Sequence, residues 1–190
     1  KPGTMIYPLP AVMVSCGEAE SEYNMTTVAW TGTLCTEPPM CYISLRKTRH
    51  SHEIISRTKC FVINLTTKEL CKATDWCGVR SGRDYNKFKE TGLTAVKSQN
   101  INAPYIEESP LCIECEVIEI KELGSHDMFI AKVVGVFADE RYIDSESGLF
   151  DLESAGLLSY SHGKYYSLGE RLGFFGYSIQ KKKNTQKRKK

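Results

Sequence analysis

Apolar residues along this chain gather in short stretches that lack the spacing of a helix. The stretches that we predict as strands are residues 6–16, 26–34, 40–45, 60–65, 113–117 and 128–138. Pro38 and Pro39 separate the second stretch from the third, and a turn at Gly124 and Ser125 precedes the last. In residues 113–117 apolar and acidic side chains alternate, which is typical of a strand with one face in water. We therefore predict a chain that is mostly strand, with the last two stretches paired as a hairpin.

Three short segments between these strands carry helix signals. Residues 51–56 have Ser51 as a capping residue, residues 67–75 begin at a capping Thr67 and stop near Gly78, and residues 83–90 end at Gly92. Strands from end to end with inserted helices predict a mainly β fold, a β-barrel with peripheral helices. A parallel Rossmann sheet is not expected, because the chain has neither a regular βαβ alternation nor a G-x-G-x-x-G motif.

The composition is that of a folded domain of ordinary size. The 190 residues are 41% hydrophobic and 25% charged, and no apolar run reaches the length that a membrane-spanning helix needs. Seven of the last ten residues are Lys or Arg. We predict one domain over residues 1–180 and a basic, disordered tail over residues 181–190. A tail that binds nucleic acid or a membrane is the less favoured interpretation.

The eight cysteines are expected to be free thiols in the cytoplasm, because a domain with a full hydrophobic core needs no disulfides. Cys112 and Cys115 have the spacing of a zinc-binding pair. No second pair occurs, however, and positions i and i+3 of a strand face opposite sides. His50 and His52 diverge similarly at a helix start. We therefore predict no metal site, and no nucleophile or P-loop motif identifies a catalytic residue.

Polar residues interrupt the strand predicted at 26–34 in a way that a plain barrel does not require. Threonines stand at positions 26, 27, 31, 33 and 36. Gly32 lies inside the strand, where a glycine weakens the sheet unless another group approaches the backbone closely. Free main-chain N–H and C=O groups at this point can form hydrogen bonds with the edge of a flat heterocycle, and Trp30 can stack against its ring.

Cations and hydroxyl groups gather at two further places. Residues 46–51, Arg-Lys-Thr-Arg-His-Ser, precede a predicted helix N-terminus, where free N–H groups and the helix dipole favour an anion such as phosphate. Residues 81–88 repeat the combination of a turn, cations and hydroxyl groups. Each stretch alone also fits a solvated charged loop. Together they indicate a phosphorylated, planar ligand.

Residues 24–39 fit the pattern N-x-x-T-x-x-W-x-G-x-x-x-x-x-P-P, and an apolar strand at 40–46 follows. Companion motifs occur at residues 61–64, 77–88, 103–104 and 124–127. In this order the motifs resemble the flavoredoxin branch of the flavin reductase-like, FMN-binding split barrels. The resemblance extends from about residue 7 to about residue 142 of this sequence. It implies a Greek-key split barrel that forms a homodimer, with FMN near the subunit interface.

Matching positions imply which residues surround the cofactor. The isoalloxazine ring is expected against the run from Trp30 to Cys35, the phosphate near Asn24 and Lys87, and a histidine approaches from the hairpin. The cofactor-binding residues are, in chain order, Asn24, Trp30, Thr31, Gly32, Thr33, Leu34, Cys35, Arg49, His50, Ser51, Lys87 and His126. Ser51 stands where some relatives have Thr, which keeps the hydroxyl group. Tyr160, His162, Tyr165 and Tyr166 match no family pattern, so they do not identify the second substrate.

Three functional hypotheses follow. FMN carries the redox chemistry itself, which agrees with the absence of an acid–base pair in the sequence. The protein can be an NAD(P)H-dependent reductase of free flavin or ferric chelates, or a non-enzymatic carrier that exchanges electrons with a redox protein partner. The third hypothesis is a flavin-free binding barrel. None of them involves a membrane or a specific nucleic acid.

Overall fold

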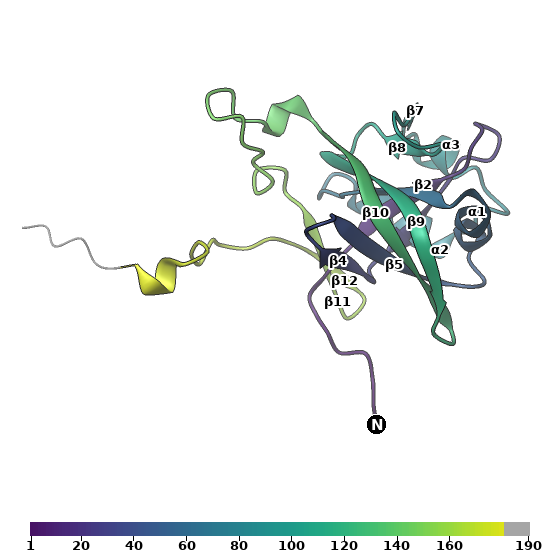
Figure 1. The fold of residues 1–190 in the computed structure, drawn as a ribbon, viewed down its shortest axis with the longest axis horizontal. Helices are drawn as coiled ribbons and strands as arrows, with labels where there is room; N and C mark the ends of the chain where they lie inside the picture. Colours follow the sequence, from purple (N-terminus) through teal and green to yellow (C-terminus); the bar gives the residue numbers. More distant parts are fainter. Residues whose placement is uncertain (181–190) are drawn as a thin grey trace, which may run out of the picture.

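The computed structural model describes residues 1–180, and its centre is one seven-stranded antiparallel sheet (Figure 1). In spatial order its strands are β3 (Asn24–Val28), β2 (Val12–Cys16), β6 (Cys60–Asn64), β9 (Leu111–Glu122), β10 (His126–Ala138), β5 (Met40–Arg46) and β4 (Thr31–Cys35). The order departs repeatedly from the order along the chain, so the fold is a mainly β barrel with crossed connections, as predicted.

Smaller elements surround this sheet. A three-stranded sheet joins the two ends of the chain, β1 (Leu9–Pro10) pairing with β11 (Leu158–Ser161) and β11 with β12 (Lys164–Ser167). The remaining elements are β7 (Ala95–Lys97), β8 (Pro104–Ile106), α1 (His50–Thr58), α2 (Cys71–Val79), α3 (Lys87–Thr91) and the 3-10 turns η1 (Glu140–Tyr142) and η2 (Tyr177–Ile179). None of the helices described is long and apolar enough to cross a membrane.

The main core lies inside the curled sheet. Val28 of β3 and Cys41 of β5 belong to the same buried cluster, although their strands lie near opposite ends of the sheet. The Ser44 amide donates a hydrogen bond of 2.9 Å to the Trp30 carbonyl, which continues the pairing of β5 with β4 up to the bend that follows β3. Phe61 and Phe129 are fully buried in this cluster. Burial of such side chains supplies most of the driving force that closes the barrel.

A second core holds the helices against the sheet. Met13, Met25 and Ile106 are fully buried beside Cys77 of α2 and Phe88 of α3. All five residues of β2 are buried, because one face of the strand meets the main core and the other meets the helices. This explains why the sequence of the strand does not alternate between apolar and charged residues, as the sequence of a strand with one face in water would. The arrangement fixes α2 and α3 next to β3.

Four of the predicted strands are confirmed. The stretches at 40–45 and 60–65 correspond to β5 and β6, and those at 113–117 and 128–138 are parts of β9 and β10. β9 and β10 form the predicted hairpin across Gly124, whose φ of 101° suits a glycine turn. Both strands extend further toward that turn than predicted, because cross-strand pairing continues to Asp127 and Glu122.

Two predicted strands are each divided in the structure. The stretch 6–16 contains β1 and β2, which belong to different sheets. The stretch 26–34 contains β3 and β4, which are separated at Ala29 and Trp30. The chain bends there because β3 pairs with β2, whereas β4 pairs with β5. The predicted continuous strand was therefore wrong at the residue that matters most for the site, Trp30.

The helices also differ from their predicted starts. α1 begins at His50 after Arg49, and Ser51 does not cap it; the Ser51 hydroxyl accepts a hydrogen bond from Asn24 Nδ2 at 2.8 Å instead. α2 begins at Cys71, because Thr67 forms an isolated β-bridge with Leu157. Gly78, predicted to stop this helix, lies inside its last turn.

The third helix starts later than predicted and ends where predicted. α3 begins at Lys87, where the Asn86 side chain accepts a hydrogen bond from the Lys89 amide at 3.0 Å. The residues predicted before it form turns. Gly92 ends the helix in the left-handed conformation, with φ of 70°, as predicted.

The cysteines are unbonded, and the pair with zinc-like spacing is divided between two cores. Cys115 packs in the barrel interior and Cys112 in a separate cluster with Val62 and Ala103. The opposite orientation predicted for these two residues is thus confirmed. Within residues 1–180, no group of three or more metal-ligating side chains occurs. The basic tail predicted at 181–190 lies outside the described residues.

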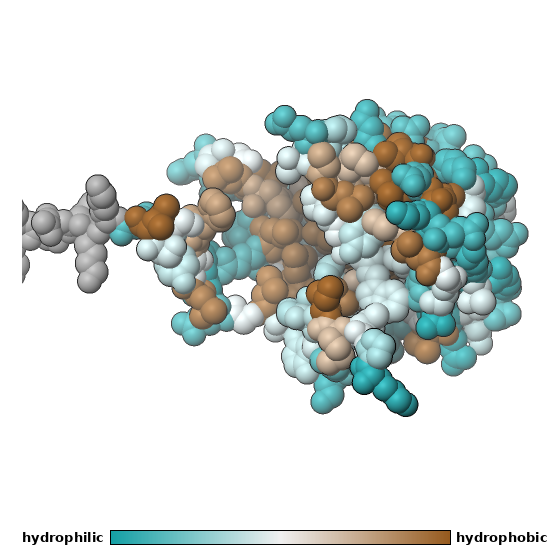
Figure 2. Space-filling model, turned by 60° about the horizontal axis from the view of Figure 1, so that its bottom comes forward, coloured by the Kyte–Doolittle hydropathy of each residue, from teal (hydrophilic) through white to brown (hydrophobic). Residues whose placement is uncertain are grey.

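Apolar side chains remain exposed on the C-terminal segment after β12. This segment, yellow-green to yellow in Figure 1, runs away from the barrel. Its exposed large hydrophobic residues are Leu168, Leu172, Phe174, Phe175, Tyr177 and Ile179. Figure 2 shows apolar residues gathered in the hollow between this segment and the body of the molecule. Exposed apolar groups in such number are typical of a surface that another chain covers.

Candidate functional site

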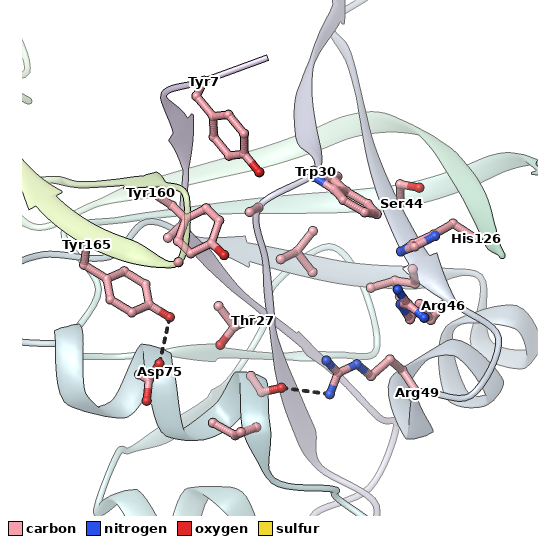
Figure 3. A pocket seen from close by; sticks show the side chains of 17 residues that line it. Tyr7, Thr27, Trp30, Ser44, Arg46, Arg49, Asp75, His126, Tyr160 and Tyr165 are labelled. Carbon is pink, nitrogen blue, oxygen red and sulfur yellow. Dashed lines mark hydrogen bonds between the residues drawn. The ribbon is translucent and has the colours of Figure 1, made fainter. Parts of the chain in front are cut away.

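Two adjoining cavities open beside β3, at the N-terminus of α1 and the C-terminus of α2, and Figure 3 shows the residues that line the larger one. The larger has a volume of about 400 Å³ and the smaller about 250 Å³. Arg46, Arg49 and Val79 line both of them, so the two form one continuous site. Such a concave site is the usual form of a small-molecule or cofactor site.

The smaller cavity contains a buried cation without a counterion. Lys87 of α3 is 2% exposed, and its Nζ donates a hydrogen bond of 2.6 Å to the Cys77 carbonyl of α2. It forms no salt bridge with any described residue. Burial, together with the nearby charge of Arg49, lowers the pKa of the Lys87 ammonium to about 8. An anion bound next to this ammonium offsets the cost of burying it.

Other donors point to the same place. Asn24 of β3 and Ser51 of α1 are both buried and joined by a hydrogen bond. His50 Nδ1 is buried and has no hydrogen-bond partner among the described residues. These groups stand at the N-terminus of α1, where unpaired N–H groups and the helix dipole favour negative charge. The chemistry of this donor set fits a phosphate group.

A glycine allows the loop after α2 to close over this cavity. A Cβ atom placed on Gly82 would lie 2.1 Å from Asn24 Oδ1 and 2.7 Å from its Cγ. These separations are well below van der Waals contact, so the close approach of the loop to Asn24 requires glycine. Ser81 and Arg80 of the same loop line the cavity beside it. The loop therefore forms the outer wall of the smaller cavity.

The larger cavity has aromatic walls. Trp30 and His126 have their ring centroids 4.4 Å apart on one side, and Tyr7, Tyr160 and Tyr165 stand on the other (Figure 3). Burial, together with the charges of Arg46 and Arg49, lowers the pKa of His126, which keeps its ring neutral at pH 7. Aromatic side chains on two sides with polar groups at the rim suit a flat ring system.

The tyrosine wall is anchored to α2 at one point. The Tyr165 hydroxyl donates a hydrogen bond of 3.1 Å to Asp75, and burial raises the pKa of this phenol (Figure 3). The hydroxyl groups of Tyr7 and Tyr160 have no hydrogen-bond partner among the described residues. On the opposite side, Arg49 donates a hydrogen bond of 2.8 Å to the Gly78 carbonyl. Tyr165 and Arg49, on opposite sides of the larger cavity, are thus both held by α2.

The structure brings seven of the predicted cofactor-binding residues to these cavities. Those lining the smaller cavity are Asn24, His50, Ser51 and Lys87, those lining the larger are Trp30 and His126, and Arg49 lines both. They come from β3, the bend after it, α1, α3 and β10. The grouping of residues distant in sequence agrees with the predicted phosphorylated, planar ligand.

The other five predicted residues lie apart from the two cavities. Thr31, Gly32, Thr33, Leu34 and Cys35 make up β4, an edge strand that pairs only with β5, and none of them lines either cavity. The Tyr42 ring accounts for the mid-strand glycine, because a Cβ atom on Gly32 would lie 3.1 Å from it. The strand follows Trp30 directly in the chain.

Several lining residues were not predicted as site residues. Among them are Tyr7, Thr27, Asp75, Arg80, Tyr160 and Tyr165. Thr27 and Arg80 lie inside motifs that were recognised. The tyrosines come from the two ends of the chain, which meet only because β1 pairs with β11. The cluster of aromatic residues at 160–166 was the one sequence signal for this wall.

Similarity to known proteins identifies the family of this chain. The family model described as "Flavin reductase like domain" matches residues 4–169. An uncharacterized protein of Pyrococcus abyssi is 30% identical over 130 residues, which cover 68% of this chain and 74% of that protein. The solved structure of flavoredoxin from Desulfovibrio vulgaris (Miyazaki F) is 29% identical, with a TM-score of 0.87 over 94% of this chain and 97% of that one.

Two further solved structures share the fold, and one of them is of a protein that binds a cofactor. An FMN-binding protein from Thermus thermophilus is 25% identical, with a TM-score of 0.78 over 92% of this chain and 94% of that chain. A putative flavin reductase with a split barrel domain from Shewanella frigidimarina is 24% identical with a TM-score of 0.79, over 90% of this chain and 86% of that one. The chain belongs to the flavin reductase-like family of split β-barrel proteins.

Proposed function

We propose that this protein is an FMN-binding flavoprotein that acts in redox electron transfer. The observation that carries the proposal is the junction of the two cavities. A cradle with a buried, uncompensated cation opens directly into a larger space with aromatic walls. FMN combines a phosphate group and a flat ring system in one molecule. The family and the FMN-binding relative support a flavin cofactor.

The phosphate of FMN is assigned to the smaller cavity. Lys87 supplies the charge, and Asn24, Ser51 and His50 supply hydrogen-bonding groups at the N-terminus of α1. Arg49 stands between the phosphate and the ring, since it lines both cavities. A charge-assisted hydrogen bond of this kind contributes roughly 1.5 to 3 kcal/mol.

The ring is assigned to the larger cavity beside Trp30 and His126. FMN supplies the redox chemistry when bound, accepting a hydride or single electrons. The protein's own residues hold and orient the ring, and the tyrosine wall controls access to it. Thr31, Gly32, Thr33, Leu34 and Cys35 are proposed as the flank of the ring site on the free edge of β4.

A homodimer is part of the proposal. The β4 edge is unpaired in this sheet, and the C-terminal segment presents exposed apolar side chains, among them Phe174 and Phe175. Unpaired edges and apolar surfaces are features that proteins usually cover. A second copy on these surfaces would enclose the ring site. We place the protein in the cytoplasm, where its eight thiols stay reduced.

We propose an NAD(P)H-linked activity, the reduction of free flavin or ferric chelates. The family, whose model is described as flavin reductase-like, supports an enzyme. A carrier that exchanges electrons with a protein partner is the competing function. The two differ in whether a nicotinamide nucleotide reduces the bound flavin directly.

The experiment is an anaerobic absorption spectrum of the purified protein before and after NADH or NADPH. Flavin bands that bleach quickly support the reductase, and bands that persist until dithionite is added support the carrier. Lys87→Ala is expected to lower flavin retention by about tenfold or more. The matched control is Lys89→Ala on the exposed face of the same helix. Equal flavin content in the two variants would contradict the assigned phosphate position.

A further inference from the structure

A buried histidine–aspartate pair lies between the elements of the site and lines neither cavity. His52 Nε2 donates a hydrogen bond of 2.8 Å to Asp127 Oδ2, and the two side chains are only 16% and 5% exposed. Every other salt bridge among the described residues has a partner that is 46% exposed or more. Desolvation offsets most of what a buried pair contributes to stability, so a role in fixing position accounts for it better.

The pair joins the two elements that carry the two halves of the site. His52 lies in the first turn of α1, directly after His50 and Ser51, which line the smaller cavity. Asp127 is the second residue of β10, directly after His126, which lines the larger cavity. One side-chain contact therefore connects the turn that forms the smaller cavity with the strand end that forms part of the larger one.

The start of β10 needs such an anchor. The strand begins at His126, immediately after the exposed turn at Gly124 and Ser125, and strand ends next to exposed turns open most easily. Successive residues of a strand face opposite sides, so a contact that holds Asp127 on one face fixes His126 on the other. The His126 ring lies beside Trp30, with the ring centroids 4.4 Å apart (Figure 3).

The pair itself is held in a defined orientation. The His52 ring stands edge-on to Phe129 of the barrel core, with centroids 5.1 Å apart and planes at 80°. Asp127 Oδ1 lies 3.4 Å from Lys47 Nζ, and it is buried without a hydrogen-bond partner among the described residues. Within residues 1–180, the Asp127 side chain thus receives its hydrogen bond from His52 alone.

We propose that His52 and Asp127 are positioning residues that align the smaller cavity with the larger one. The inference rests on the proposed function, which assigns these cavities to the phosphate and the ring of FMN. A ligand that bridges two subsites binds tightly only where their spacing is fixed in advance, because ordering them on binding costs affinity. His52 acts through the turn that carries His50 and Ser51. Asp127 acts through His126.

The test compares FMN with riboflavin, which lacks the phosphate, in calorimetric titrations of the flavin-free protein. We expect His52→Leu to lower the ratio of the two affinities by about fivefold, because the phosphate then reaches its donors only at an ordering cost. A variant that is merely less folded weakens both ligands by the same factor and leaves the ratio unchanged. His52→Gln keeps an N–H donor of similar reach, so it should restore most of the wild-type ratio.

A second readout needs no flavin. In the NMR spectrum of the flavin-free protein, the ring current of Trp30 shifts the imidazole C–H resonances of His126, which are assigned by their loss in His126→Asn. In His52→Leu and in Asp127→Ala these resonances should move toward the positions of a solvated imidazole. The double variant should move them no further than either single variant does, because the two residues act through one contact.

Arg57→Leu is the matched control. Arg57 lies in the last turn of the same helix, where it pairs with Glu18 and Glu22, and it lines neither cavity. The variant removes ion pairs that hold α1, but at the end of the helix away from His52. Both readouts should stay at the wild-type values. An equal fall of the affinity ratio in this variant would mean that any loosening of the helix has the same effect, and it would overturn the assignment.

The proposal requires both changes in His52→Leu, and the absence of either one overturns it while leaving the FMN site intact. An equal loss of both ligands with an unchanged ratio would make the pair purely structural. A fall of the ratio in His52→Gln as large as in His52→Leu would show that the hydrogen bond to Asp127 is not the cause. A wild-type protein that binds neither FMN nor riboflavin refutes the proposed function and this inference together.

Discussion

Replacing Lys87 by methionine should stabilise the flavin-free protein and weaken its affinity for FMN. The buried ammonium has a pKa of about 8, against an ordinary value of 10.5. One pKa unit corresponds to 1.36 kcal/mol, so the charged form costs the folded state roughly 3 kcal/mol. Methionine has a similar shape and no charge. It leaves the Cys77 carbonyl without its 2.6 Å partner, a loss of about 1 to 3 kcal/mol that does not depend on pH.

The pH dependence separates these two effects. The folded-state pKa is lower than the unfolded one, so between pH 8 and 10.5 the unfolded chain binds more protons and wild-type stability rises with pH. Below pH 8 both states are protonated and the whole cost is present. The advantage of Lys87→Met over the wild type should therefore shrink by about 2 kcal/mol between pH 6.5 and pH 9.5.

The assay is urea unfolding of flavin-free wild type, Lys87→Met and Lys89→Met at pH 6.5, 8 and 9.5. Lys89 is exposed, so the free energy of unfolding of its variant should follow the wild type at every pH. FMN titrations of the same proteins should show an affinity loss of about tenfold or more for Lys87→Met alone. A difference between Lys87→Met and wild type that does not change with pH would refute the argument for a buried, uncompensated cation.

Three further predictions concern the walls of the site and the core. Gly82→Ala should reduce FMN retention in a spectroscopic assay, because its Cβ atom would clash with Asn24; retention equal to wild type would show that the loop can move aside. Tyr165→Phe removes the hydrogen bond to Asp75 and should destabilise the β11–β12 hairpin by about 1 kcal/mol, measured as faster amide hydrogen exchange there and not in β9 or β10. Phe129→Ala in the barrel core should cost about 3 to 5 kcal/mol in urea unfolding, and a cost below 1 kcal/mol would contradict the packing described.

Features encoded by neighbouring residues were predictable from the sequence. The β9–β10 hairpin follows from an alternating stretch, an apolar stretch and a glycine turn between them. The cavity proposed to hold a phosphate lies where the sequence gathers cations and hydroxyl groups before α1, next to the free N–H groups of that helix. The end of α3 follows from Gly92, because glycine adopts the left-handed conformation without strain.

Features set by tertiary contacts were not predictable in the same way. Thr67 has the sequence signature of a helix cap, but it bridges to Leu157 instead, and α2 begins later. The bend at Trp30 depends on which strand each half pairs with, and local propensity does not contain that information. The tyrosine wall joins residues from both ends of the chain, so only the folded barrel shows that Tyr7 and Tyr160 share one cavity.

The most direct test of the central claim is a titration of the flavin-free protein with FMN and with riboflavin. The two ligands share the ring system and differ in the phosphate group, so the ratio of their affinities isolates the contribution of the cradle around Lys87. The account predicts that FMN binds at least tenfold tighter than riboflavin, since charge-assisted hydrogen bonds to the phosphate contribute roughly 1.5 kcal/mol or more. Equal affinity for the two ligands, or binding of neither, would contradict it.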